Sequence, residues 1–561
     1  MKEMQLLLGN SGSGKTTALY DKLVKEAEEN PKKQFFLLVP EQYTLEAQRD
    51  VVEHTKRHGT TNIDIVSFNR LCYRVFEKMG TSVDTVLEDH GKSMLLRRVL
   101  GEIEKKLKLY HNMKDKAGFL DQMKSVLSEF YQYDLTSEQL HGLLDQMEPE
   151  QLLTYKMHDL VLIYDAFSAA LGQSYMVAEQ LSDLFCEVAK DCPLLFGAGF
   201  YLDGFTGFTP IQYRVIETLL DGAEEFVVTL TMDQMAYEKR FLKRQHLFTL
   251  SVQTYQKLVD CFKEQQKEEA ELREITFFNQ PPKRLQSALD LAALEAGLFR
   301  SRQVEEQVCY AGEVSHVMLW EAVNETAEIH AVANEICDLI GQGVRYRDIA
   351  VVSTEEERYA KEIEYIFSKY HIPCFFDHTT EIMNHPYVET LRAVLDILAK
   401  QGAGFTMERV IRYAQSPLSG IRKDEMEQLY VYLTAVGDLS YKAYVGGFKK
   451  VPKSYYVKGK TQEERAHAEE RKERYLKHIN DIRARMMEPL LPVLPFFLKP
   501  HTVTERVRAC YDYLVERQFE KKLLRYAEEL REQGDYVTAK TWEGVYPAML
   551  SLLDKIVSLL G

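Results

Sequence analysis

The chain has 561 residues, of which 45% are hydrophobic and 28% charged, and its formal net charge is −15. This length exceeds what one hydrophobic core usually serves, so we expect several domains, and the composition excludes a largely disordered or collagen-like chain. The acidic balance confines any nucleic-acid contact to local clusters of Lys and Arg. The first residues lack a signal-peptide pattern and no apolar run approaches the roughly 20 residues that span a bilayer, which predicts a cytoplasmic protein without a membrane segment.

A short apolar strand from Met4 to Leu8 leads into a glycine-rich segment, which a helical stretch to about Glu28 follows. Residues 9–16 fit the pattern GxxxxGK[ST] at the position between strand and helix that its mechanism requires. The backbone amides would surround a β-phosphate, Lys15 would reach the β- and γ-phosphates, and Thr16 would offer its hydroxyl to Mg²⁺. The predicted nucleotide-binding residues are Gly9, Asn10, Ser11, Gly12, Ser13, Gly14, Lys15, Thr16 and Thr17.

Four further apolar segments are typical of buried strands and alternate with helices, which indicates a parallel α/β sheet. These segments are Phe35–Pro40, Ile63–Phe68, Phe196–Phe205 and Glu225–Asp233. Carboxylates at the carboxyl ends of parallel strands face a phosphate loop, so we predict that Asp203 is a second contact of the Mg²⁺ at Thr16. A capping or turn aspartate is the alternative for Asp203.

Helical periodicity with almost no strand signal interrupts this sheet, and a second α/β unit begins near the segments VSHVMLWEA and DIAVVS. We expect a first α/β domain at residues 1–85 and 190–305, a helical insertion at 86–189, the start of a second α/β domain at 306–385, and another helical insertion at 386–561. No later strand completes the second sheet, so we expect the chain to be truncated before that sheet is finished.

Several short motifs together resemble the AddB family, which forms one half of the bacterial AddAB helicase–nucleases. They are the phosphate loop, VPEQYT (39–44), SFNRL (67–71), YLDGFTGFTPIQ (201–212), DIAVVS (348–353) and HIPCFFD (371–377). Each motif except the phosphate loop is weak alone, but they occur in the family's order and with its spacing. The resemblance covers essentially the whole chain.

The resemblance implies a superfamily-one helicase-like fold, in which RecA-like parallel-sheet domains of the P-loop NTPase type carry large all-helical insertions. It implies ATP and Mg²⁺ as cofactors, an AddA-type helicase/nuclease subunit as the partner in a heterodimer, and single- and double-stranded DNA ends as ligands. The implied role is resection of double-strand breaks for recombinational repair, with Chi recognition by the AddB protein. A nuclease domain and an iron–sulfur cluster are expected only in the missing C-terminal part.

Residues that contact the Chi strand in the family match positions of this chain that suit single-strand recognition. They are Gln42, Thr44, Phe68, Arg70, Tyr73 and Phe208. Aromatic rings can stack on unpaired bases, Arg70 can hold a base or phosphate, and Gln42 can read a base edge. Burial in the core is the alternative for Phe68 and Tyr73. The basic segment at 449–460 is a further candidate for DNA contact, with a solvated surface as its alternative.

Two departures from active helicases favour a degenerate motor. Gly204 stands where related motors place the catalytic Glu, and Ser353 and Thr354 stand where an arginine often follows the strand. We therefore expect weak or absent ATPase activity and no nuclease activity in this segment, within one component of an ATP-dependent helicase/exodeoxyribonuclease. The alternative is an active superfamily-one DNA-translocating ATPase. A small-molecule kinase is disfavoured, because such enzymes rarely carry two long helical insertions.

Overall fold

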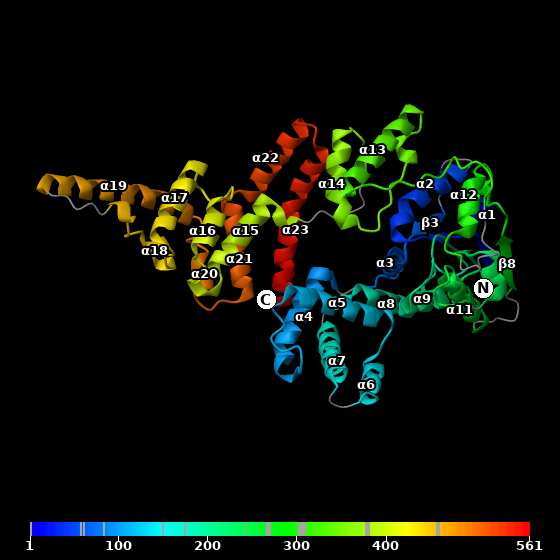
Figure 1. Ribbon diagram of the computed structural model, residues 1–561. Helices are drawn as coiled ribbons and strands as arrows, with labels where there is room; N and C mark the ends of the chain where they lie inside the picture. Colours follow the sequence, from blue (N-terminus) through cyan, green and yellow to red (C-terminus); the bar gives the residue numbers. More distant parts are fainter. Residues whose placement is uncertain are drawn as a thin grey trace. The chain divides into compact units, whose positions relative to one another are not determined.

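A computed structural model gives the arrangement of the chain as two compact units, Met1–Val344 and Arg345–Gly561, and we describe each by itself (Figure 1). The described residues are 3–55, 59, 62–81, 85–148, 151–172, 175–240, 242–264, 271–300, 310–375, 382–455 and 461–560.

The first unit is built on a sheet of parallel strands, whose described members follow the order β3-β2-β6-β7-β1-β8. The strands are β1 (Glu3–Gly9), β2 (Phe35–Leu38), β3 (Ile63–Val66), β6 (Gly199–Leu202), β7 (Glu225–Thr231) and β8 (Glu271–Phe277). Because all of these strands run in one direction, the loops that follow them meet at one edge of the sheet. The sequence motifs of interest lie in those loops.

Helices cover both faces of this sheet, because its central strands carry apolar side chains on alternating faces. On one face Leu6 and Phe226 pack against α3, α8, α9 and α11, whereas on the other Leu7 and Tyr201 pack against α1 and α2. The helices of the sheet layers are α1 (Lys15–Glu29), α2 (Thr44–His54), α3 (Phe68–Met79), α8 (Leu181–Val188), α9 (Pro210–Gly222), α10 (Gln234–Lys239) and α11 (Thr249–Glu264).

A mainly helical segment separates β3 from β6 along the chain. It contains α4 (Asp89–Ile103), α5 (Ala117–Gln132), α6 (Ser137–Asp145) and α7 (Leu152–Leu171), together with two short paired strands, β4 (Thr85–Leu87) and β5 (Tyr175–Val177). Its last helix, α8, belongs to the sheet layers, because Leu181 and Phe185 pack in the core beneath the sheet.

The predicted α/β class with a parallel sheet is confirmed. The ends of the five strands predicted for this sheet lie within three residues of the observed ends, and two differences matter. The third strand ends at Val66, so that Phe68 begins α3 rather than ending a strand. The edge strand β8 was not predicted from the sequence, because charged residues interrupt its apolar pattern and more than half of its residues are exposed.

After β8 the first unit continues through α12 (Leu289–Gly297) and α13 (Glu325–Gly341). Between these helices lies an irregular segment in which Leu319 is 98% exposed to solvent and Val323 is 97% exposed. Residues 310–375 are described and contain no strand. The second α/β domain that we expect at 306–385 stays a prediction.

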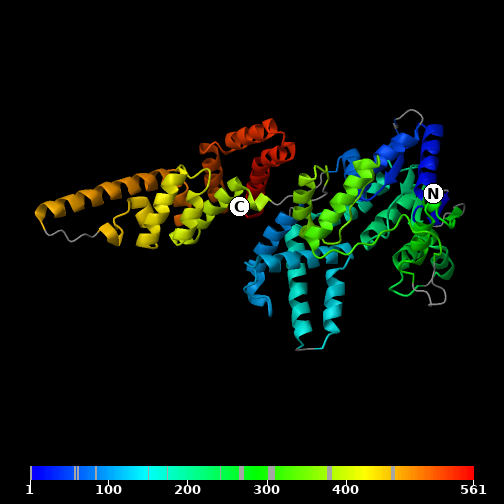
Figure 2. The same cartoon turned by 45° about the horizontal axis from the view of Figure 1, so that its top comes forward.

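All regular secondary structure in the described residues of the second unit is helical. Its helices are α14 (Glu356–Lys369), α15 (Pro386–Leu398), α16 (Met407–Ala414), α17 (Lys423–Val436), α18 (Tyr441–Gly446), α19 (Gln462–Met487), α20 (Leu494–Leu498), α21 (Val503–Glu516), α22 (Phe519–Glu532) and α23 (Tyr536–Leu560). Figure 2 shows the long helix α19 extending beyond the other helices of this unit. In the described parts of both units, every helix is too short or too polar to cross a membrane.

Gly9, the last residue of β1, allows β8 to approach the phosphate loop. A Cβ at Gly9 would lie 2.5 Å from the carbonyl oxygen of Phe277 and 2.9 Å from Ser13 Oγ. We predict that Gly9→Ala lowers the free energy of unfolding by about 1–3 kcal/mol, because backbone atoms must shift to admit the methyl group.

Urea denaturation followed by circular dichroism measures this change, with Gly101→Ala as the control. Gly101 lies in α4 and a Cβ there meets nothing within 4 Å. The control should gain up to about 1 kcal/mol from helix propensity. Equal stability of Gly9→Ala and the parent would contradict the close approach.

Candidate nucleotide site and candidate nucleic-acid interface

The candidate nucleotide site begins where β1 ends and α1 starts. Gly12 and Gly14 have φ angles of +70° and +99°, a conformation that favours glycine, and Gly14 is the residue preceding α1. The glycines therefore let the loop turn tightly enough to direct its amides toward one point at the helix N-terminus. Anions bind well at such a point, because the free amides and the helix dipole both favour negative charge.

Lys15 is folded back onto the loop that precedes it. Its Nζ donates hydrogen bonds to the carbonyl oxygens of Gly9 at 2.9 Å and Asn10 at 2.7 Å. Burial lowers the pKa of Lys15 to about 8, and the nearby charge of Asp203 opposes that shift. The ammonium group is thus held inside the loop, where a polyphosphate would provide a stronger partner than two carbonyls.

Asp203 follows β6 and contacts the first turn of α1. Its Oδ1 accepts a hydrogen bond from Thr16 Oγ1 at 3.2 Å and another from Thr229 Oγ1 at 2.5 Å. Burial raises the pKa of Asp203, whereas the hydrogen bonds from both threonines and the charge of Lys15 act in the opposite direction. The sequence-predicted pair Thr16 and Asp203 is therefore brought together, with the two oxygens that would both face one Mg²⁺ ion.

Thr229 is a site residue that we did not identify from the sequence. It lies in β7, the strand between β1 and β6, and its hydroxyl donates to Asp203 at the end of β6. A threonine inside the apolar run EFVVTLT was the available signal.

Of two buried polar atoms in the loop, the Ser13 hydroxyl fits a bound anion, whereas the amide oxygen of Asn10 can only accept a hydrogen bond. Ser13 is fully buried and Asn10 is 2% exposed, yet Ser13 Oγ and Asn10 Oδ1 have no hydrogen-bond partner among the described residues. A buried hydroxyl without a partner costs free energy, and a phosphate oxygen would accept the Ser13 proton. The residues present therefore suit a nucleotide phosphate.

The position after Asp203 has a backbone conformation that favours glycine. Gly204 has φ +80°, and a Cβ there would lie 3.5 Å from Pro40. Space is sufficient for a side chain, but the positive φ disfavours every residue except glycine. A glutamate at this position would therefore be strained.

A second group of predicted residues lies after the neighbouring strands β3, β2 and β6. Gln42 in the turn after β2 is exposed, and Arg70 and Tyr73 in α3 are exposed as well, with Tyr73 at 46%. Arg70 has no side-chain partner among the described residues. Thr44 is buried instead, and its hydroxyl donates to the carbonyl oxygen of Glu41 at 2.7 Å. We call Gln42, Arg70 and Tyr73 the polar edge.

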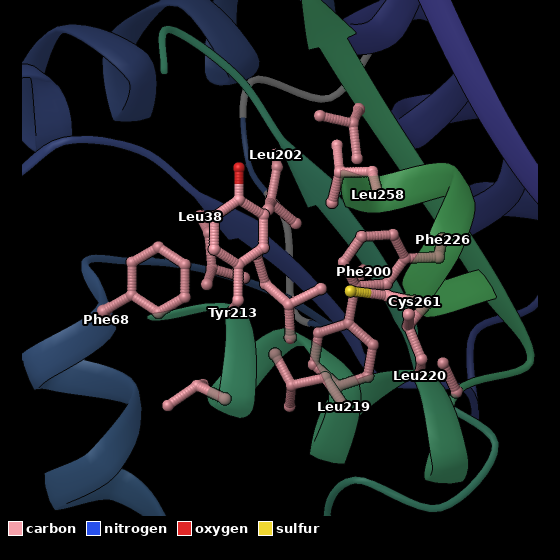
Figure 3. Packing of buried hydrophobic residues seen from close by; sticks show 14 of the residues in the cluster. Leu38, Phe68, Phe200, Leu202, Tyr213, Leu219, Leu220, Phe226, Leu258 and Cys261 are labelled. Carbon is pink, nitrogen blue, oxygen red and sulfur yellow. The ribbon is translucent and has the colours of Figure 1, made fainter. Parts of the chain in front are cut away.

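Phe68 lies in the hydrophobic core next to the polar edge, and Phe208 packs against that core. Phe68 is 7% exposed, and its ring lies 5.6 Å from Phe205 and 6.0 Å from Phe208. Figure 3 shows Phe68 among the buried side chains of the hydrophobic core that also contains Tyr213. Core packing, the alternative considered for Phe68 and Tyr73, therefore describes the position of Phe68 but not that of the exposed Tyr73.

The basic segment at 449–460 lies in the second unit, and its residues 456–460 are outside the described part. Tyr455 stacks on Tyr475 with ring centroids 4.4 Å apart, and the Arg471 guanidinium lies 5.9 Å from the Tyr455 ring. Tyr455 thus has a structural partner in α19.

Two family profiles match this chain. Residues 6–295 match the profile described as "ADDB, N-terminal", and residues 276–489 match that of the UvrD-like helicase C-terminal domain. The chain belongs to the AddB family. The second match agrees with the helicase-like fold class predicted above.

Curated relatives agree with this assignment to the AddB family. The chain is 32% identical to the B subunit of the ATP-dependent helicase/deoxyribonuclease of Lachnoclostridium phytofermentans, and the match covers 100% of this chain and 47% of that protein. The corresponding proteins of Caldanaerobacter subterraneus and Alkaliphilus metalliredigens are 31% and 30% identical, and the matches cover 100% of this chain and 46% and 47% of those proteins. The chain thus spans about half the length of the curated relatives it matches.

The lowered pKa of Lys15 predicts a pH dependence of ATP binding. Above pH 8 the free protein loses the Lys15 proton, and ATP binding must then take up a proton, so the affinity falls up to about tenfold per pH unit. Calorimetric titrations with ATP–Mg²⁺ between pH 7 and pH 10 measure this loss.

Lys15→Arg is the matched control, because arginine stays charged over that range.

The unfolded chain binds more protons than the native chain between about pH 8 and the ordinary lysine pKa of 10.5, so Lys15 makes the free energy of unfolding rise with pH across this window. A parent affinity that does not change with pH would rule out this role of Lys15.

Proposed function

We propose that this AddB-family chain binds ATP–Mg²⁺ at the phosphate loop and uses it mainly as a structural ligand. The observation that carries the proposal is the contact of Thr16 with Asp203 beside the buried, unpartnered Ser13 hydroxyl. Loop amides and Lys15 would hold the phosphates, and Thr16 and Asp203 would hold the metal ion. When bound, Mg²⁺ would neutralise negative charge on the phosphates.

The absence of turnover follows from the loop after β6. Hydrolysis needs a group that orients the attacking water, and Gly204 has no side chain at the position where related motors carry a glutamate. A bound nucleotide in such a site contributes to stability and to the arrangement of the surrounding loops without being consumed.

We propose that the complete protein acts as the AddB component of an ATP-dependent helicase/deoxyribonuclease that resects double-strand breaks for recombinational repair. Its partner would be an AddA-type protein that supplies the translocating motor, and its ligands would be single- and double-stranded DNA ends. The names of the relatives and the match to a UvrD-like helicase domain support this role.

The polar edge is the proposed place of contact with single-stranded DNA and of Chi recognition. Gln42 follows β2 and Arg70 and Tyr73 follow β3, so the paired strands place all three at one edge of the sheet. Tyr73 would stack on a base, Arg70 would bind phosphate or base, and Gln42 would read a base edge. Thr44, Phe68 and Phe208 would act by positioning this edge.

Nucleotide binding without turnover is the first prediction of this proposal. The chain should bind ATP–Mg²⁺, and Lys15→Ala should weaken binding by at least about tenfold, because a charge-assisted contact is lost. Calorimetry measures the binding, and phosphate release with and without single-stranded DNA measures the turnover.

Gly204→Glu should leave turnover absent, because at φ +80° the substituted residue costs about 1–2 kcal/mol and the loop must distort. DNA-stimulated turnover that Lys15→Ala abolishes would instead make the chain an active superfamily-one motor.

The second prediction concerns Tyr73. Tyr73→Ala should weaken binding of an oligo-dT strand by about 5- to 150-fold, since stacking of a base on an aromatic side chain contributes roughly 1–3 kcal/mol. Fluorescence anisotropy at one fixed salt concentration measures the affinity, and Tyr73→Phe should retain it.

Tyr133→Ala is the comparison variant, because Tyr133 is 63% exposed at the end of α5 and lies in the helical segment. A loss of affinity as large for Tyr133→Ala as for Tyr73→Ala would refute a specific contact at the polar edge.

A further inference from the structure

A short turn after β8 places two cations against the phosphate loop. The turn is the 3-10 helix η5 (Lys283–Leu285), which follows Phe277 by six residues. The backbone amide of Arg284 donates to the carbonyl oxygen of Gly12 at 3.0 Å. The turn is therefore tied to the middle of the loop by the backbone, whatever side chains it carries.

The side chains of this turn lie along the loop at its two left-handed glycines. A Cβ at Gly12 would lie 3.0 Å from Arg284 Cβ, and a Cβ at Gly14 would lie 3.3 Å from Lys283 Cδ and 3.6 Å from Lys283 Nζ. Both glycines thus leave room for the stems of the cations, in addition to adopting their φ angles.

The charges at this place are unbalanced. Lys15, Lys283 and Arg284 gather at the N-terminus of α1, where the helix dipole disfavours cations. Lys283 and Arg284 are exposed, and neither side chain has a hydrogen-bond or ion-pair partner among the described residues. The nearby carboxylate of Asp203 is engaged with Thr16 and Thr229. A polyanion would relieve this repulsion, and the buried Ser13 hydroxyl independently requires an acceptor.

We propose that Lys283 and Arg284 bind the polyphosphate of the nucleotide from the side of β8. They would supply the cationic charge on the β- and γ-phosphates that the sequence lacks at Ser353 and Thr354. A nucleoside triphosphate gains most from this arrangement, a diphosphate less and a monophosphate little. This inference rests on the proposed nucleotide binding at the phosphate loop.

The test compares the binding of ATP–Mg²⁺, ADP–Mg²⁺ and AMP to the whole chain by calorimetry. The variant Lys283→Gln/Arg284→Gln keeps the length of both stems and removes both charges. We expect it to weaken ATP binding by about tenfold or more, ADP binding less and AMP binding not at all. The variant with exchanged cations, Lys283→Arg/Arg284→Lys, should retain most of the ATP affinity.

Lys32→Ala serves as the matched control, because Lys32 is an exposed lysine in the turn before β2, at the opposite edge of the same sheet. Unchanged ATP affinity in the double Gln variant, with binding lost in Lys15→Ala, would overturn this inference and leave nucleotide binding intact. Equal weakening for ATP and AMP would also overturn it, because that result indicates a disturbed loop. Absence of ATP binding by the parent would overturn the proposed function itself.

Discussion

The parallel pairing of β1 with both β7 and β8 is the constraint on which the candidate site depends. Because β1 lies between these strands, the phosphate loop has a neighbour on each side. β7 brings Thr229 into hydrogen-bond contact with Asp203, and β8 brings η5 against the glycines. Antiparallel pairing on either side would carry those residues to the opposite edge, so the direction of the strands is what assembles the site.

Much of this arrangement could be predicted from the sequence, because buried parallel strands are continuous apolar runs. The strands ending at Gly9, Leu38 and Thr231 were recognisable for that reason, and so was the α/β class. β8 was not recognisable, because an edge strand has one side in solvent and tolerates charge there. Its Glu271, Arg273 and Glu274 obscured the pattern.

The second feature that the sequence did not predict was the direction in which individual side chains point. Phe68 and Tyr73 are aromatic residues five positions apart, and both were candidates for stacking or for core packing. On a helix that spacing turns them to different sides, and Ser67, whose side chain accepts from the Arg70 amide, starts the helix just before Phe68. Ser67 was therefore the signal that could have separated the two residues. The approach of Lys283 and Arg284 to the loop had no such signal, since more than 260 residues separate them from Gly14.

The irregular segment before α13 exposes a cluster of apolar side chains that bears on the solubility of this chain. Leu319, Trp320 and Val323 expose 98%, 65% and 97% of their surfaces within five residues of sequence. Adjacent exposed apolar side chains associate, and excluded salts such as ammonium sulfate strengthen that association. This segment should therefore contribute to precipitation by such salts, and replacing Leu319 and Val323 with polar residues should raise the solubility limit without touching the sheet or the phosphate loop.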